Sequence, residues 1–353
     1  MKKYHLFILF VLIHGITLAQ SSTKSKVRIG AYYFGGWTSA TDFHITSKLR
    51  DTFPERRPLW GWVSTSAQTM KTQIDLAADA GLSFFNFDWY YPNDKPYPKE
   101  VLNSDLGLYL QAPNKSRLKF CLFVANHVGY RVGPKDWAFD VDYWIKLFKD
   151  KDYLKVNNKP YISFFSQGDM IYTFGSIEAV HKALDSLRQV AKANGLGGVT
   201  IAICVSPEAK KVAEAKACGF DTFTAYNYPT VGFKKGQNTA DVDSLLAGNK
   251  RIWDRFLNFG LPYIPVSTLN WDPRPWRKAG SNQDARYYTG YSAESIRKSI
   301  LAVQKWVDDN PAYTYKDKIA MVYAWNEIGE GGYMMPTKDF NPLIGVEQAL
   351  IYR

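Results

Sequence analysis

Two glutamates near the C-terminal end of the chain, Glu327 and Glu330, are close enough in sequence for their carboxyl groups to act together in acid–base catalysis. They lie three residues apart in the segment Trp325-Asn326-Glu327-Ile328-Gly329-Glu330. Two carboxyl groups that face one bond can supply a general acid and a base, the pair that glycoside cleavage uses. Neighbouring carboxylates also push their pKa values apart, so that one is protonated while the other is ionised. The structural alternative is a pair of exposed loop acids that form salt bridges.

The elements that must position this pair alternate between strand-like and helix-like segments. The strand-like segments are short, almost continuously apolar and rich in Val, Ile, Phe and Tyr, as strands buried on both faces require. Eight strands are expected, at Val27–Phe34, Leu82–Asp88, Leu118–Ala125, Pro160–Phe165, Val199–Val205, Phe220–Tyr226, Pro262–Leu269 and Ile319–Trp325. Amphipathic helices are expected between them, at Ser66–Ala80, Trp137–Phe148, Ile177–Ala193, Pro207–Cys218, Asp241–Phe259 and Ser292–Val307.

Eight strand–helix repeats predict a single α/β domain, a (β/α)8 barrel over residues 20–353. An open doubly wound sheet is the alternative, but no glycine-rich dinucleotide fingerprint follows the first strand. In such a barrel the active site lies at the carboxyl ends of the strands. The long segment 35–62 is expected to be a loop on that face.

The residues that follow the expected strands are aromatic rings, amides and carboxyl groups. Flat rings can stack on the faces of sugars, and amides and carboxyl groups can bind sugar hydroxyls. The expected substrate-binding residues are Tyr32, Tyr33, Asp88, Trp89, Tyr90, His127, Tyr226, Asn227, Trp271 and Asn326.

Four polar residues near the strand ends also have structural interpretations. Asp88 is an alternative acid, but it could equally cap a turn or pair with Arg274. His127 could bind a sugar hydroxyl or simply satisfy its hydrogen bonds within a polar loop. Asp272 and Arg274 are expected to form an ion pair that shapes their loop rather than to take part in catalysis.

The stretch from Trp325 to Thr337, W-N-E-I-G-E-G-G-Y-M-M-P-T, resembles the strand-eight motif of glycoside hydrolase family 99 and related endo-α-mannosidase-like barrels. Related polysaccharide-biosynthesis proteins, often labelled glycosyltransferases, share this motif. Supporting matches are Gly30–Phe34, the aromatic and acidic segment Phe85–Tyr91, and Trp271-Asp272-Pro273-Arg274. The landmarks extend over most of the chain.

The resemblance implies a retaining reaction on an α-linked sugar through a 1,2-anhydro sugar. No cofactor is expected for the Glu327 and Glu330 pair, and no metal is expected because the sequence shows no set of histidine and carboxylate ligands. Glu327 would then remove the proton from the sugar 2-hydroxyl, and Glu330 would be the general acid on the glycosidic oxygen. Tyr32 or Tyr33 and Trp89 would line the subsite of the reacting sugar. Ile328-Gly329 departs from the endo-α-mannosidase pattern, so mannose itself is not implied.

The N-terminal residues have the pattern of a secretory signal. Lys2 and Lys3 precede a short apolar run that ends in small and polar residues by Ala19-Gln20, so residues 1–19 are expected to be a cleaved signal peptide. This predicts a periplasmic or extracellular protein without stable membrane insertion. The three cysteines have neither disulfide-framework nor zinc-site spacing.

The formal charge of +11 is compatible with an acidic partner, but the basic residues are dispersed and no nucleic-acid motif is present. The expected partner is a glycan or oligosaccharide, with an anionic polysaccharide as one alternative, and nucleic acid is not expected. The leading hypothesis is a secreted glycoside hydrolase. The alternatives are a glycosyl-transferring protein of polysaccharide metabolism and a carbohydrate-binding barrel without turnover.

Overall fold

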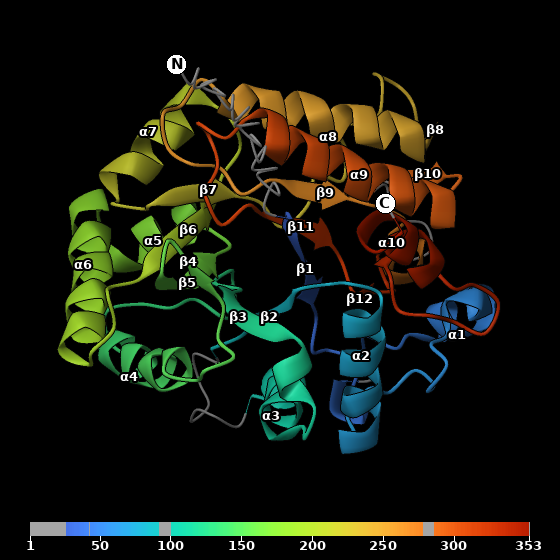
Figure 1. Cartoon of the computed structure of the whole chain (residues 1–353), viewed down its shortest axis with the longest axis horizontal. Coiled ribbons are helices and arrows are strands. Elements are labelled where there is room, and N and C mark those ends of the chain that lie inside the picture. Colours follow the sequence, from blue (N-terminus) through green and yellow to red (C-terminus); the bar gives the residue numbers. More distant parts are fainter. Residues whose placement is uncertain (1–25, 42, 92–99, 278–285, 353) are drawn as a thin grey trace, which may run out of the picture.

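The computed structural model describes residues 26–41, 43–91, 100–277 and 286–352. Their central feature is a (β/α)8 barrel of parallel strands (Figure 1). Each strand of the barrel falls within one of the eight segments predicted from apolar runs, or extends at most one residue beyond it. The barrel strands are β1 Arg28–Tyr33, β2 Phe84–Trp89, β3 Lys119–Val124, β5 Lys159–Phe164, β6 Thr200–Cys204, β7 Thr222–Thr224, β9 Val266–Thr268 and β11 Ile319–Tyr323.

Neighbouring strands pair in chain order, and β1 pairs with β11. The remaining gap, between β7 and β9, is bridged by the residues that precede β9. Phe223 donates its backbone N–H to Pro262 O at 3.1 Å, and Ile264 donates to Phe223 O at 2.9 Å. The barrel is therefore closed, which leaves its strands without an exposed edge.

Helices surround the strands (Figure 1). All six predicted helices are present, as α2 Ala67–Asp79, α4 Trp137–Phe148, α6 Ile177–Ala193, α7 Ala209–Ala217, α8 Val242–Phe256 and α9 Ala293–Asp309. The structure adds four further helices, α1 Ser47–Thr52, α3 Ser104–Gln111, α5 Gln167–Phe174 and α10 Leu343–Leu350. Short 3-10 turns are η1 Ser39–Thr41, η2 Pro54–Arg56, η3 Val101–Asn103, η4 Lys115–Arg117 and η5 Arg274–Trp276. Minor strands are β4 Lys155–Val156, β8 Thr239–Asp241, β10 Tyr287–Thr289, β12 Asn326–Glu327 and β13 Gly332–Tyr333.

The long segment 35–62 is not a plain loop, because it contains η1, α1 and η2. Thr46 caps α1, since its hydroxyl accepts a hydrogen bond from the Leu49 N–H at 3.1 Å. Leu49 is fully buried and attaches the segment to the barrel. The segment therefore has a fixed path over the face where the candidate site lies.

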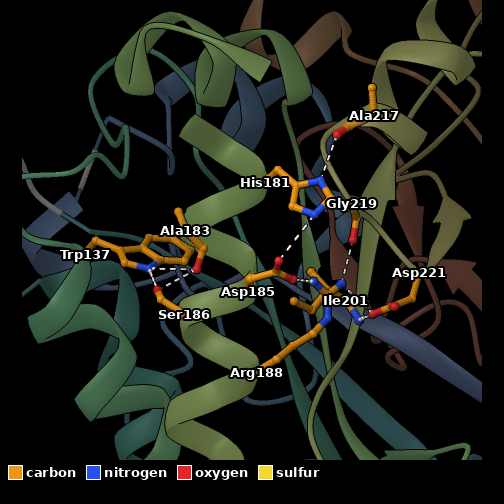
Figure 2. A network of polar contacts seen from close by, with 10 residues as sticks. All are labelled: Trp137, His181, Ala183, Asp185, Ser186, Arg188, Ile201, Ala217, Gly219 and Asp221. Carbon is orange, nitrogen blue, oxygen red and sulfur yellow. Dashed lines mark hydrogen bonds and ion pairs between the residues drawn. The ribbon is translucent and has the colours of Figure 1, made fainter. Parts of the chain in front are cut away.

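At the opposite end of the barrel, a polar network ties α6 to the starts of two strands (Figure 2). Arg188 on α6 bonds to Gly219 O and to Asp221 Oδ2, 3.1 Å away. Asp221 also accepts the Ile201 N–H at 2.8 Å. This network stabilises the amino-terminal side of β6 and β7, far from the carboxyl ends.

Within the described residues, no helix has the length and apolar character needed to cross a membrane. The predicted signal peptide, residues 1–19, lies outside the described residues.

Candidate active site

Glu327 and Glu330 lie on a tight hairpin that follows the last barrel strand. β12 pairs antiparallel with β13, so that Glu327 is opposite Gly332 and Glu330 falls in the turn. Trp325 and Ile328 are fully buried in the core and fix the orientation of the hairpin. Although the two glutamates are three residues apart, both line the same cavity.

Asn326 clamps this hairpin to the end of β1. Its Oδ1 accepts the Phe34 N–H at 2.8 Å, and its Nδ2 donates to Phe34 O at 2.7 Å. The Trp37 indole N–H donates to Asn326 O at 2.8 Å. Both ends of the Asn326 amide are satisfied by backbone. Asn326 therefore positions Glu327 and does not reach the cavity, unlike the substrate contact that the sequence predicted.

The loop after β9 holds the hairpin from the other side. Asp272 donates its N–H to Glu330 O at 2.6 Å, and the buried Arg56 guanidinium donates to Ile328 O at 3.0 Å. Arg56 also forms an ion pair with Asp272. Arg274 bonds to Asp272 at 2.7 Å, so the predicted Asp272–Arg274 pair is present, with Arg56 as an unpredicted third member. The alternative pairing of Asp88 with Arg274 is not observed, since Arg274 already has its acid in the same loop.

A cavity of about 440 Å³ opens at the carboxyl ends of the strands. Both glutamates line it, which brings the two candidate catalytic residues into one space. Six of the ten predicted substrate-binding residues also line it, namely Asp88, Tyr90, His127, Tyr226, Asn227 and Trp271.

Three other predicted contacts lie in the core instead. Tyr32 and Tyr33 on β1 and Trp89 on β2 are fully buried and do not line the cavity. The Tyr32 hydroxyl donates to Ala225 O at 2.5 Å, and the Tyr33 hydroxyl accepts a hydrogen bond from Gln73 at 3.0 Å. Successive residues at a strand end point in opposite directions, so proximity to the strand end does not place a side chain in the cavity.

Part of the cavity lining was not foreseen from the sequence. His44 and Trp276 form part of it, with ring centroids 5.8 Å apart. Burial lowers the pKa of His44 to about 4, so its ring is neutral near pH 7 and acts as a flat aromatic surface. The other unpredicted lining residues are Phe34, Phe43, Leu102, Phe123, Ala125, Tyr130 and Phe165.

On the carboxyl side, Tyr226 lies between two acids. Its hydroxyl is 2.8 Å from Asp88 Oδ2 and 2.5 Å from Glu327 Oε1. Burial raises the pKa of Glu327, and the charges of Glu330 and Asp88 raise it further. Burial likewise raises the pKa of Asp88 well above its usual range. Burial and the neighbouring acidic charges therefore favour the protonated forms of Glu327 and Asp88.

Glu330 has a different partner, the Tyr323 hydroxyl, which donates a hydrogen bond to it. Burial raises the pKa of Glu330 to about 7, while the Tyr323 hydrogen bond and the charge of Arg277 oppose the rise. A carboxyl group with this pKa is substantially protonated at neutral pH and can donate its proton. No group of three or more metal-binding side chains is found among the residues that the structure describes.

Fold and site together define a (β/α)8 barrel with one buried and one half-buried carboxyl group, Glu327 and Glu330, at the carboxyl ends of its strands. The chain belongs to the family described as Glycosyltransferase WbsX, whose model matches residues 62–343. A search of curated proteins finds no match.

Several solved structures share the fold. A GH99 endo-α-mannosidase from Bacteroides thetaiotaomicron, in complex with bis-tris propane, is 13% identical, with a TM-score of 0.62 over 92% of this chain and 95% of that one. A glycoside hydrolase-like protein is 12% identical, with a TM-score of 0.63 over 92% and 93%. A GH5-4 broad-specificity endoglucanase from an uncultured bacterium is 11% identical, with a TM-score of 0.51 over 92% and 94%. At these identities the likenesses establish the barrel fold.

Proposed function

We propose that the protein is a secreted glycoside hydrolase that cleaves an α-linked glycan with retention. The single observation that carries the proposal is that Glu327 and Glu330 face one cavity with different partners, Tyr226 and Tyr323. Different partners give two carboxyl groups different protonation states at one pH, which acid–base cleavage of a glycoside needs.

In the proposed reaction Glu330 gives its proton to the glycosidic oxygen as the bond from that oxygen to C1 breaks. Glu327 removes the proton of the sugar 2-hydroxyl, whose oxygen bonds to C1 and forms a 1,2-anhydro sugar. Glu330, now ionised, takes a proton from water as the water oxygen attacks C1 and the anhydro ring opens. Glu327 returns its proton to O2, so both acids regain their starting states. The α-linkage and the anhydro intermediate come from the resemblance of the strand-eight motif.

The remaining cavity wall suits a neutral sugar. The rings of Trp271, Trp276 and His44 offer flat apolar faces, and Asn227 and His127 offer hydrogen bonds to hydroxyls. None of the described residues that line the cavity is Lys or Arg. Glu327, which is ionised in the proposed reaction, would repel an anionic glycan. We therefore assign the positive charge of the chain to its general surface rather than to substrate binding.

The family description favours a second candidate, glycosyl transfer from an activated donor. Donors of the sugar-nucleotide class carry a diphosphate, which proteins usually hold with basic side chains, backbone N–H groups or a metal ion. The acidic cavity offers no such basic side chain among its described lining residues. This observation favours hydrolysis over transfer.

A panel of substrates tests the proposal. Purified protein is incubated with α-mannans, other α-glycans, anionic polysaccharides and sugar nucleotides, and products are followed by chromatography and mass spectrometry. We expect hydrolysis of a neutral α-glycan, and a loss of at least 100-fold in Glu327→Gln and Glu330→Gln, within the usual range for general acid–base catalysis. Glu208→Gln, an exposed glutamate on the surface, is the matched control and should remain active.

Other outcomes of this panel would point elsewhere. Turnover of a sugar nucleotide alone would favour glycosyl transfer. Glycan binding without any product, unchanged in both variants, would indicate a binding barrel. Secretion is tested separately, by determining the N-terminal residue of the exported protein, which should lie just after Ala19.

A further inference from the structure

The cavity that holds the two glutamates continues across the carboxyl ends of β5, β6 and β7. A second cavity, of about 300 Å³, shares Phe165, Tyr226 and Asn227 with it. A third cavity, of about 330 Å³, shares Phe165, Cys204 and Val205 with the second. Because Phe165 lines all three, they form one continuous groove. We call the second and third cavities together the side groove.

The side groove offers space beyond the position of the acids. Each of its two cavities is as large as the smaller pockets in which proteins hold small molecules, which begin near about 300 Å³. Among the described lining residues, Glu327 and Glu330 belong only to the first cavity, of about 440 Å³. A ligand that fills the side groove therefore places there a part of itself that does not contact the acids.

Phe165 is an exposed but firmly held ring at the entrance to the side groove. It is 38% exposed, and its N–H donates to Asn126 Oδ1 at 2.9 Å and to Val124 O at 3.0 Å. Its ring lies nearly perpendicular to the rings of Phe123 and Tyr226, at 83° and 89°, with centroids 5.9 and 6.2 Å away. A flat apolar surface that is already fixed can stack on a sugar without a further cost of ordering.

The far end of the side groove contains a buried amide with an unused acceptor. Gln167, in the first turn of α5, lines the third cavity and is 8% exposed. Its Nε2 donates to Glu214 Oε2 at 3.2 Å, whereas its Oε1 is buried and has no hydrogen-bond partner among the described residues. A buried acceptor without a partner destabilises a folded chain, and a ligand hydroxyl in this cavity would supply the missing donor.

The other polar groups of the third cavity suit hydroxyls rather than a charged ligand. They are the side chains of Ser166 and Ser206 and one side chain of each sign, Lys211 and Glu214. The Lys211 ammonium already lies 3.2 Å from Glu208 Oε1, so its charge is balanced within the protein. An aromatic ring at the entrance and uncharged hydrogen-bonding groups at the far end are the combination that a neutral sugar chain needs.

We propose that the side groove binds further sugar units of the α-glycan whose scissile linkage lies at Glu327 and Glu330. Phe165 is then a stacking platform and Gln167 the hydrogen-bond acceptor at the far end. The protein selects an oligosaccharide long enough to enter all three cavities rather than a single terminal sugar. The choice of a glycan as the ligand rests on the proposed function.

Calorimetric titration of the Glu330→Gln variant, which should not cleave its ligand, tests this proposal. The probes are α-linked oligosaccharides of mannose, of glucose and of galactose, each graded from two to six units. In at least one series the affinity should rise with length until the side groove is filled.

A second substitution blocks the side groove without touching the acids. Gly168 lines the third cavity, and a Cβ added to it meets only Ser166 Oγ at 4.0 Å, so α5 has room for a side chain there. Gly168→Leu should weaken binding of the longest probes by about tenfold, which corresponds to roughly 1.4 kcal/mol, and leave the shortest probe unaffected. Gln167→Met, which keeps the side-chain length but removes the acceptor, should act in the same direction. Gly107→Leu in α3, where an added Cβ meets nothing within 4 Å, is the matched control and should leave every affinity unchanged.

The proposal is overturned if no series binds more tightly as it lengthens. It is equally overturned if Gly168→Leu or Gln167→Met binds the longest probes as tightly as the parent variant, or weakens all lengths alike. Length-dependent binding without any product in the substrate panel would refute hydrolysis and leave the side groove assigned. Cleavage of short and long chains with equal efficiency would do the reverse.

Discussion

The indole of Trp276 lies against the backbone of Gly329. A Cβ placed on Gly329 would be 2.2 Å from Cε2 of that ring, well inside any real contact. The Ile328-Gly329 pair between the two glutamates departs from the endo-α-mannosidase-like pattern, and this contact supplies a physical reason. The small residue lets an aromatic wall of the cavity approach the hairpin that carries both acids.

Gly329→Ala should therefore displace Trp276 and narrow or distort the cavity. We expect a loss of about 1–3 kcal/mol in the free energy of unfolding, the usual cost of overpacking, and a raised KM for the glycan. Chemical denaturation and steady-state kinetics measure the two effects. Gly107→Ala in α3 is the control, because its Cβ meets nothing within 4 Å and alanine favours a helix. Equal effects of the two substitutions would contradict the role of the Gly329 contact.

Removing the Tyr323 hydroxyl should shift the alkaline side of the pH–rate profile. The hydrogen bond from Tyr323 lowers the pKa of Glu330, which burial raises to about 7. In Tyr323→Phe this pKa should rise by on the order of one unit, the effect of losing one hydrogen bond to a charged group. A general acid works while protonated, so activity should persist to higher pH than in the wild type. A shift to lower pH would show that Glu330 does not act as the acid.

We expect Asp140 in α4 to make the free energy of unfolding depend on pH, independently of any enzymatic activity. Burial raises its pKa to about 8, and neither of its carboxyl oxygens has a hydrogen-bond partner among the described residues. An unfolded aspartate titrates near pH 4, so between about pH 4 and 8 the folded chain keeps a proton that the unfolded chain releases. This contribution to the free energy of unfolding is present below pH 4 and is lost as the pH rises toward 8.

The side chain that Asp140→Asn introduces cannot ionise, so this substitution should remove the loss of stability between pH 4 and pH 8. We expect the variant to be more stable than the wild type by about 1–3 kcal/mol at pH 8, and to approach the wild type at pH 4. Urea unfolding at the two pH values measures the difference. A variant that is destabilised equally at both pH values would show that the Asp140 charge is compensated in the folded protein.

We expect Arg56 to contribute both to the free energy of unfolding and to the position of the hairpin that carries Glu327 and Glu330. Its guanidinium pairs with the buried Asp272 and donates to Ile328 O in the catalytic hairpin. Arg56→Met should cost roughly 3–5 kcal/mol, because it removes one partner of a buried ion pair. Activity should fall further than stability alone explains, since the hairpin loses an anchor. Arg57→Met, at the exposed neighbouring position, should change neither unfolding nor turnover.

The barrel could be predicted from the sequence because each of its strands is buried on both faces. Runs such as Phe120–Val124 and Ile319–Tyr323 are apolar at every position, and this pattern does not depend on distant contacts. The helices α4 and α6 begin and end at the predicted residues because their apolar faces repeat with helical spacing. The four additional helices are short, eight residues or fewer, and carry too few turns to show such a repeat.

The acidic residues of the site could also be predicted from the sequence, whereas the aromatic residues His44 and Trp276 could not. Asp88 lies near the end of β2, Tyr226 follows β7, and the two glutamates lie in the hairpin after β11. The barrel geometry therefore brings them to one cavity. His44 and Trp276 reach the cavity on loops, whose paths depend on contacts such as the Trp276 indole donating to His44 O at 3.1 Å. Tyr323 lies at the end of the last barrel strand, β11. The sequence does not show to which side of that strand its side chain points, so Tyr323 could not be predicted as the partner of Glu330.

The most direct measurement of the central claim compares two substrates of the Glu330→Gln variant. One is the α-glycan identified by the panel, and the other is an α-linked aryl glycoside of the same sugar whose phenol leaves without protonation. We predict that the variant loses turnover of the glycan by 100-fold or more but releases the first equivalent of phenol at close to the wild-type rate, in a burst, because only the later attack of water still needs Glu330 as a base. Equal loss on both substrates, or no loss on the glycan, would contradict the assignment of Glu330 as the general acid at this site.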